Sequence, residues 1–126
     1  MRSPPLKSEL LAPGMRVGLF GGTFDPPHAG HLHVARTAMR RLNLHRVWWL
    51  VSPQNPLKRR QAGDLARRMN AVAGLASEPR MVVSDIEARL GINRTVDLMR
   101  ALKRRYPDVR FVWIMGADNL SSIHRW

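Results

Sequence analysis

Short apolar runs alternate along this chain with segments in which apolar residues recur at helical spacing. The runs predict four strands, at residues 16–20, 46–51, 80–84 and 110–115. The other segments predict helices at residues 32–42, 65–76 and 93–106, with a loop at residues 52–64 and a helix cap at Asn93 or Thr95. Strands that alternate with helices predict an α/β fold in which flanking helices cover a parallel sheet.

Three loops follow predicted strands, and they begin near Gly21, Pro53 and Gly116. The carboxyl ends of parallel strands meet at one edge of a sheet, and this edge is where such folds bind ligands. We therefore expect the three loops to converge on one site.

The length of 126 residues and the hydrophobic fraction of 44% suit one modest domain with a packed core. Residues 1–15 contain Pro4, Pro5 and Pro13 and no continuous apolar stretch, so we expect a disordered leader before a domain at residues 16–126. No run approaches the ~18 apolar residues of a membrane span. The absence of cysteine excludes disulfides and, with the absence of a targeting signal, favours the cytoplasm.

The formal net charge of +12 predicts acidic partners, such as nucleotides, phosphates, nucleic acid or an anionic membrane surface. The same charge is also compatible with general solubility. The basic residues are spread along the chain and do not form one tail or a basic helix with interleaved aromatics. This distribution argues against a dedicated nucleic-acid-binding protein.

The stretch from Gly21 to His31 carries the strongest chemical signal. Its glycines allow a phosphate to approach the backbone closely, because no Cβ stands in the way. His28 and His31 are three residues apart at the predicted entrance of a helix, whose free N–H groups and positive dipole end favour an anion. Both imidazoles can therefore face one phosphate. Zinc binding is the weaker interpretation, since the chain has no cysteine and no third aligned ligand.

The motif Gly-Gly-Thr-Phe-Asp-Pro-Pro-His-Ala-Gly-His resembles that of the histidine–x–glycine–histidine nucleotidyltransferases, which have a Rossmann-like fold, and in particular the nicotinate-nucleotide adenylyltransferase family. Further similarity lies at residues 51–58, in the helix with Arg67 and Met69, and at residues 112–126. Glu87, Thr95 and Asp97 are also similar to the family. The resemblance implies transfer of AMP from ATP to nicotinate mononucleotide, with pyrophosphate as the second product and Mg²⁺ held mainly by the ATP phosphates. NAD biosynthesis is the expected role.

The resemblance also implies a role for individual residues. His28 and His31 would hydrogen-bond the α- and β-phosphate oxygens, and Lys58 would add a positive charge. The remaining expected binding residues are Gly21, Gly22, Thr23 and Phe24 around the phosphate loop, Thr95 at the nicotinate carboxylate, Gly116 and Asp118 near the adenosine, and Trp126 against the pyridine ring.

Several of these residues have a purely structural alternative. Lys58 belongs to a charged run that solvent alone would explain, and Thr95 can serve as a helix cap. Gly116 and Asp118 can form a turn with an aspartate cap. The other histidines and three of the tryptophans are expected to be structural: His33, His45, His124, Trp48, Trp49 and Trp113.

The sequence departs from the family pattern at two places. Arg94 stands before Thr95 where the family commonly has an aromatic residue, and the chain ends at Trp126 without the family's Ser/Thr-rich phosphate-binding segment. We therefore expect a C-terminally truncated member with an incomplete sheet, which would self-associate through exposed apolar surface or form a homo-oligomer. Two other functions stay open: another acceptor, such as nicotinamide mononucleotide or phosphopantetheine, or nucleotide binding without turnover.

Overall fold

The computed structural model describes residues 11–53, 61–92 and 94–114. For residues 61–63 it describes the backbone alone. Its elements are β1 (Arg16–Gly22), α1 (Ala29–Arg41), β2 (Arg46–Val51), α2 (Gln61–Leu75), β3 (Met81–Ser84), α3 (Ile86–Leu90), α4 (Thr95–Arg105) and β4 (Arg110–Ile114). The strands of this part form one four-stranded sheet in the order β3-β2-β1-β4, and all neighbouring strands are parallel. The expected Rossmann-like α/β architecture is confirmed.

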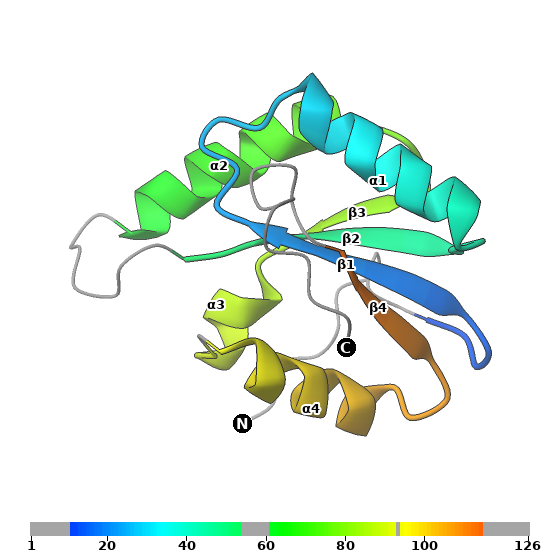
Figure 1. Cartoon of the computed structure of the whole chain (residues 1–126). Helices are drawn as coiled ribbons and strands as arrows, with labels where there is room; N and C mark the ends of the chain where they lie inside the picture. The colour runs from blue at the N-terminus through cyan, green and yellow to red at the C-terminus, as the bar shows by residue number, and fades with distance from the viewer. Residues whose placement is uncertain (1–10, 54–60, 93, 115–126) are drawn as a thin grey trace.

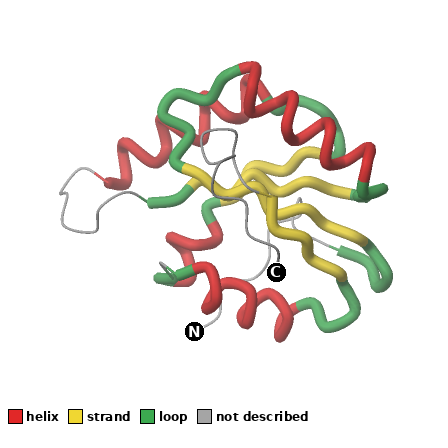
Figure 2. The backbone as a smooth tube through the Cα atoms, in the orientation of Figure 1, coloured by secondary structure: helices red, strands yellow, loops and turns green. Residues whose placement is uncertain are grey.

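The helices cover both faces of the sheet (Figures 1 and 2). Helices α1 and α2 lie on one face, and α3 and α4 lie on the other. Strands β1, β2 and β3 follow one another across the sheet, whereas β4 lies on the other side of β1. Because crossovers are right-handed, this change of direction places α4 on the face opposite α1 and α2.

The side chains of each strand alternate between two apolar layers. On β1 and β2, Phe20 and Trp49 pack under α1 and α2, whereas Leu19 and Trp48 pack against α3 and α4. All four side chains are fully buried. Strands that are buried on both faces have continuous apolar sequences, which is why residues 46–51 contain no polar position after Arg46.

The reversal of strand order places a topological switch point between β1 and β4. The residues that follow β1 leave the sheet at the carboxyl edge, next to the end of β4, because Phe20 pairs with Ile114. Gly22 pairs with Val51, so β2 ends at the same edge. Ligands of open α/β sheets bind at such a point. The loops at Gly21 and Pro53 therefore lie together as expected, and Gly116 lies outside the described residues.

The helix boundaries differ from the expected ones. Helix α1 begins at Ala29, three residues before the predicted Leu32, because polar capping at its N-terminus extends it beyond the apolar pattern. Helix α2 begins at Gln61, inside the predicted loop. Helix α3 was not predicted, since five residues are too few to display a helical period. The predicted cap at Thr95 is wrong: Arg94 is the N-cap of α4, and Thr95 is the first helical residue.

Residues 11–15 of the expected leader pack on the domain. The backbone N–H of Gly14 donates to the carbonyl oxygen of Asp108 at 2.8 Å, and Arg110 N–H donates to the carbonyl of Met15 at 2.9 Å. Leu11 and Met15 contact the apolar layer under α4. Residues 1–10 lie outside the described part of the chain. Within that part, no helix has the length and apolar character needed to cross a membrane.

Leu102 on α4 is fully buried in the layer beneath β1 and β2, so Leu102→Ala should leave a cavity. We expect the free energy of unfolding to fall by about 2–5 kcal/mol, measured by urea denaturation. Leu42→Ala is the matched control, because Leu42 is 46% exposed and its truncation should cost less than about 0.5 kcal/mol. An equal loss of unfolding free energy in the two variants would contradict the packing of α4 against the sheet.

Candidate anion-binding site

The penultimate residue of β1, Gly21, is a glycine because a ring from β4 occupies the space beside it. A Cβ on Gly21 would lie 2.7 Å from Cη2 of Trp113, a distance that real side chains do not tolerate. The next residue joins the ends of two strands, since the carbonyl of Gly22 accepts from the backbone N–H of Ser52 at 2.9 Å. The two loops that leave this edge are therefore fixed to each other where they begin.

Phe24 anchors the loop between β1 and α1. Its ring is 3% exposed and packs against Phe20, His31 and Trp49, with ring centroids 5.4, 5.2 and 5.3 Å away. Its backbone has a φ of 50°, a left-handed conformation that costs free energy for a residue with a bulky side chain. Burial of the ring offsets this cost. The sequence predicted Phe24 as a binding residue of the phosphate loop, and the structure adds this packing role.

The two histidines of the motif cap α1 reciprocally. Nδ1 of His28 accepts from the backbone N–H of Gly30 at 3.1 Å, and Nδ1 of His31 accepts from the backbone N–H of His28 at 3.0 Å. A backbone N–H can only donate, so neither Nδ1 carries a proton. In the neutral rings the proton therefore lies on Nε2.

The rings of His28 and His31 lie side by side at the helix entrance. Their centroids are 3.8 Å apart with an interplanar angle of 32°, and His31 is 4% exposed whereas His28 is exposed. The first turn of α1 holds no acidic residue. The helix dipole at this end is therefore not neutralised by its own side chains, and the arrangement suits an anion.

Gly30 separates the two histidines because the imidazole of His28 lies over it. A Cβ at this position would be 2.9 Å from both Cε1 and Nδ1 of His28. The glycine is inside α1, where alanine would otherwise be favoured by about 0.5–1 kcal/mol. The placement of the ring thus explains a residue that helix propensity alone disfavours.

Helix α2 reaches across to the same loop through ion pairs. Nη2 of Arg67 donates to Oδ1 of Asp64 at 2.6 Å and to Oδ1 of Asp25 at 3.1 Å. The hydrogen bond from Arg67, followed by that from Arg68, lowers the pKa of the Asp64 carboxyl. The pKa of Arg67 is raised, first by Asp64 and then by Asp25. Asp25 is thus tied to α2 rather than left to face the anion site.

Glu87 of α3 lies at the carboxyl edge and is partly buried. Burial raises the pKa of its carboxyl above the ordinary value, although the Ser52 hydroxyl lowers it in part by donating to Oε2 at 3.4 Å. This contact joins α3 to the end of β2. A long hydrogen bond of this kind is weak, so desolvation has the larger effect on the carboxyl.

The structure brings some of the predicted site residues together and leaves others apart. Gly21, Gly22, Thr23, Phe24, His28 and His31 form one continuous loop and helix entrance. Thr95 is exposed at the start of α4, on the opposite face of the sheet from α1. Lys58, Gly116, Asp118 and Trp126 lie outside the described residues. Among the described residues, no three His, Cys, Asp or Glu side chains are grouped closely enough to hold a metal ion.

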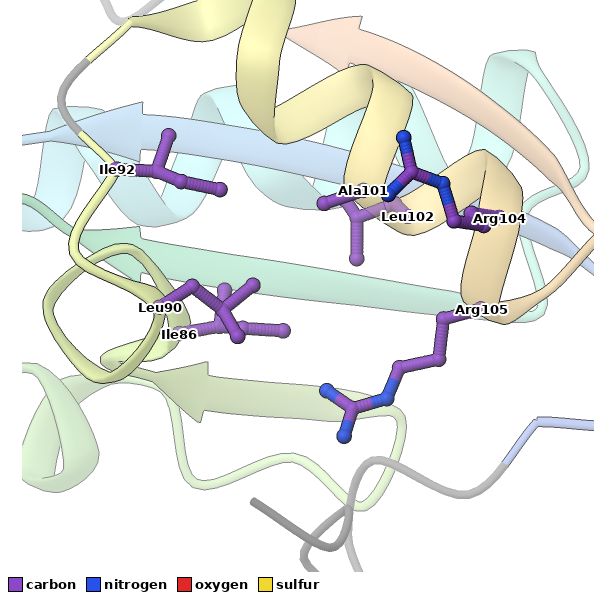
Figure 3. A pocket seen from close by; sticks show the side chains of 7 residues that line it. All are labelled: Ile86, Leu90, Ile92, Ala101, Leu102, Arg104 and Arg105. Carbon is purple, nitrogen blue, oxygen red and sulfur yellow. The ribbon is translucent and has the colours of Figure 1, made fainter. Parts of the chain in front are cut away.

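Two cavities elsewhere share no residue with the histidine site. One of about 400 Å³ lies between α3 and α4, with aliphatic walls and the guanidinium groups of Arg104 and Arg105 beside it (Figure 3). The other, of about 530 Å³, lies at the amino ends of β2 and β3 and is lined in part by Arg36, Arg40 and Arg80. Part of the positive charge is therefore gathered at the end of the sheet away from the histidines.

Comparison with known proteins places the chain in a family. A family model described as cytidylyltransferase-like matches residues 19–126. The chain is 58% identical over 114 residues to a protein of Ruegeria pomeroyi named probable nicotinate-nucleotide adenylyltransferase, covering 90% of this chain and 54% of that protein. A protein of Parvibaculum lavamentivorans with the same name is 57% identical over 122 residues, covering 95% and 60%. The chain thus spans a little over half of these curated relatives.

Solved structures share the fold. A Plasmodium falciparum nicotinic acid mononucleotide adenylyltransferase complexed with NaAD superposes with a TM-score of 0.71 at 20% identity, covering 89% of this chain and 57% of that one. The same enzyme complexed with APC gives a TM-score of 0.64 at 18% identity, covering 79% and 49%. At this level of identity the likeness establishes the architecture alone.

Replacement of Gly30 by alanine should displace the His28 ring and leave the fold intact. We expect binding of inorganic pyrophosphate, measured by calorimetry, to weaken about tenfold, which corresponds to the loss of roughly one charge-assisted hydrogen bond. Gly74→Ala on α2 is the matched control, because no atom lies within 4 Å of its added Cβ. The control should gain up to about 1 kcal/mol of stability and bind normally. Unchanged pyrophosphate affinity in Gly30→Ala would contradict a role for the His28 ring in anion binding.

Replacement of Glu87 by glutamine should stabilise the protein at neutral pH. Between the ordinary pKa of Glu87 and its raised value in the folded state, the folded protein binds more protons than the unfolded chain. Stability therefore falls as the pH rises through this window. We expect Glu87→Gln to have the higher Tm at neutral pH and the difference to shrink at pH about 3, where both states are protonated.

Glu78→Gln provides the contrast for Glu87→Gln. It removes a partly exposed ion pair with Arg36, whose Nε donates to Oε2 at 2.6 Å, so it should leave the Tm unchanged or lower it slightly. A lower Tm for Glu87→Gln than for the unmodified protein at neutral pH would argue against a destabilising buried carboxylate.

Proposed function

Because this chain belongs to the cytidylyltransferase-like family, we propose that the protein transfers AMP from ATP to nicotinate mononucleotide. The products are nicotinate adenine dinucleotide and pyrophosphate, and the role is in NAD biosynthesis. One observation carries the proposal: two imidazoles stand 3.8 Å apart at the N-terminus of α1, with their Nδ1 atoms engaged by the backbone. The names of the curated relatives support the choice of substrates.

The reaction requires positioning and charge stabilisation rather than a protein nucleophile. A phosphate oxygen of nicotinate mononucleotide attacks the α-phosphorus of ATP. The new P–O bond forms as the bond to the bridging oxygen of the β-phosphate breaks, and pyrophosphate leaves with that electron pair. The attacking oxygen is already ionised at neutral pH, so no general base is needed. Preorganised donors around the α-phosphoryl group supply the catalysis.

The capped histidines supply two such donors. With both Nδ1 atoms accepting from the backbone, each neutral ring presents Nε2–H, and the proposal directs these groups to the α- and β-phosphate oxygens. The rings need no reorganisation during the reaction, because the helix fixes both. Backbone N–H groups of Gly22, Thr23 and Phe24 would line the cleft between the two substrates.

The more distant parts of the site are proposed from the family resemblance. Lys58 would add a positive charge, Gly116 and Asp118 would lie near the adenosine, and Thr95 and Trp126 would meet the nicotinate group. Mg²⁺ would enter as the complex with ATP, coordinated by its phosphates and water. We place the activity in the cytoplasm, and oligomerisation or self-association stays a prediction.

His28→Asn separates capping from chemistry. Asparagine is an effective N-cap acceptor but lacks Nε2–H, so α1 should keep its stability to within about 0.5 kcal/mol. We expect pyrophosphate release from ATP, Mg²⁺ and nicotinate mononucleotide to slow by about 10²–10³-fold.

His33→Asn is the control, since His33 is exposed on α1 and outside the site. It should turn over at the original rate. Nicotinamide mononucleotide and phosphopantetheine are tested as rival acceptors, and faster turnover with either would replace the proposed substrate. Unchanged turnover in His28→Asn would reject the role of the histidine.

A further inference from the structure

Arg68 is a fully enclosed arginine beside the candidate site. Its side chain is 1% exposed although it belongs to α2, a helix on the surface of the sheet. Nε donates to Oδ2 of Asp64 at 2.9 Å, and Nη1 donates to the carbonyl oxygens of Thr23 at 2.8 Å and Ser52 at 2.7 Å. One side chain therefore joins α2, the loop after β1 and the end of β2.

The bond to Thr23 fixes the plane of the peptide group between Thr23 and Phe24. This peptide is trans, so its carbonyl oxygen and the N–H of Phe24 point in opposite directions. While the carbonyl is held by the buried guanidinium, the Phe24 N–H must face away from it. The buried ring and the positive φ of Phe24 fix the side chain and the backbone of the residue to which this N–H belongs.

The bond to Ser52 ties the same guanidinium to the neighbouring strand end. Ser52 already donates its backbone N–H to the carbonyl of Gly22 at 2.9 Å. Gly22, Thr23, Ser52 and Arg68 thus form a closed set of contacts around the carboxyl ends of β1 and β2. Rotation of the Thr23 peptide would break one bond to Arg68 while leaving the others in place, so the set resists that rotation.

Only a guanidinium can make these contacts together. Its planar, forked donors reach the carboxylate of Asp64 through Nε and two carbonyl oxygens through Nη1. A lysine ammonium is a single nitrogen at the end of a flexible stem, and it cannot reproduce this planar pattern of donors. Simple charge balance for Asp64 would be met by either residue, whereas orientation of the Thr23 peptide requires arginine.

We infer that Arg68 is a positioning residue that orients the Thr23–Phe24 peptide so that the Phe24 N–H is presented to the nucleotide phosphates. The inference rests on the proposed function for the identity of the anion. Arg68 itself does not touch the substrate and acts through the backbone. The Phe24 N–H is thereby a third donor, held independently of the two capped histidines.

The test compares Arg68→Lys with Val72→Ala in the whole protein. Val72 is fully buried one turn further along α2, so its truncation should destabilise the same helix without removing the hydrogen bonds of Arg68 to Thr23 and Ser52. Kinetics are measured at temperatures where each variant is fully folded. We expect Arg68→Lys to lower kcat about tenfold with KM for ATP changed by less than about threefold, since the donor acts mainly on charge that develops in the transition state.

The second readout does not depend on turnover. In Arg68→Lys the amide resonance of Phe24 should shift in the ligand-free protein, and its response to added Mg–ATP should diminish. In Val72→Ala both should match the unmodified protein, and kcat should stay within about twofold.

The outcomes separate the two proposals. An unshifted Phe24 amide in folded Arg68→Lys, or an equal loss of kcat in the two variants, would overturn the role of Arg68. Failure of the unmodified protein to release pyrophosphate would overturn the proposed function only. In that case a Phe24 shift with a diminished response of this amide to Mg–ATP, specific to Arg68→Lys, would still support the positioning role. If Arg68→Lys does not fold, Asp64→Asn takes its place in the test. This variant weakens the hydrogen bond between Arg68 and residue 64 and should shift the Phe24 amide resonance.

Discussion

The N-terminus of α1 is the feature on which the candidate site depends. A helix begins with N–H groups that have no partner within the helix, and these groups attract both capping side chains and anions. Here the same two rings meet the first demand, because Nδ1 of each histidine accepts from a backbone N–H. The proposed function assigns the second demand to Nε2 on the other side of each ring. The cap therefore sets the orientation of each imidazole before a ligand arrives.

The rest of the carboxyl edge holds this helix entrance in place. The Phe24 ring joins the loop to the apolar layer and contacts His31, so the buried histidine is fixed by packing as well as by capping. The backbone bond between Ser52 and Gly22 and the buried guanidinium of Arg68 join the ends of β1 and β2. Loops at an active site usually carry the mobile part of a protein, whereas this loop is tied to the core at several points.

Much of the fold could be predicted because its signals are local. The strands have continuous apolar sequences, the helices have an apolar period, and the functional motif is contiguous from Gly21 to His31. The errors occur where a cap or a short element, rather than an apolar period, decides the boundary. The start of α1 was set by the His28 cap rather than by apolar spacing, and the five residues of α3 were too few to show a period.

Two adjacent residues separate the local information in the sequence from the long-range contacts of the fold. Arg67 and Arg68 are chemically identical neighbours on one helix, yet their side chains are 58% and 1% exposed. The alternation of strands and helices, the glycine turn and the paired histidines can be predicted from the sequence, because each is a local pattern of residue types. The tertiary structure decided which arginine is buried and which carbonyls it holds, because Thr23 and Ser52 are 45 and 16 residues from Arg68 in sequence. Contacts across such separations follow from strand order and helix placement, which no local pattern encodes.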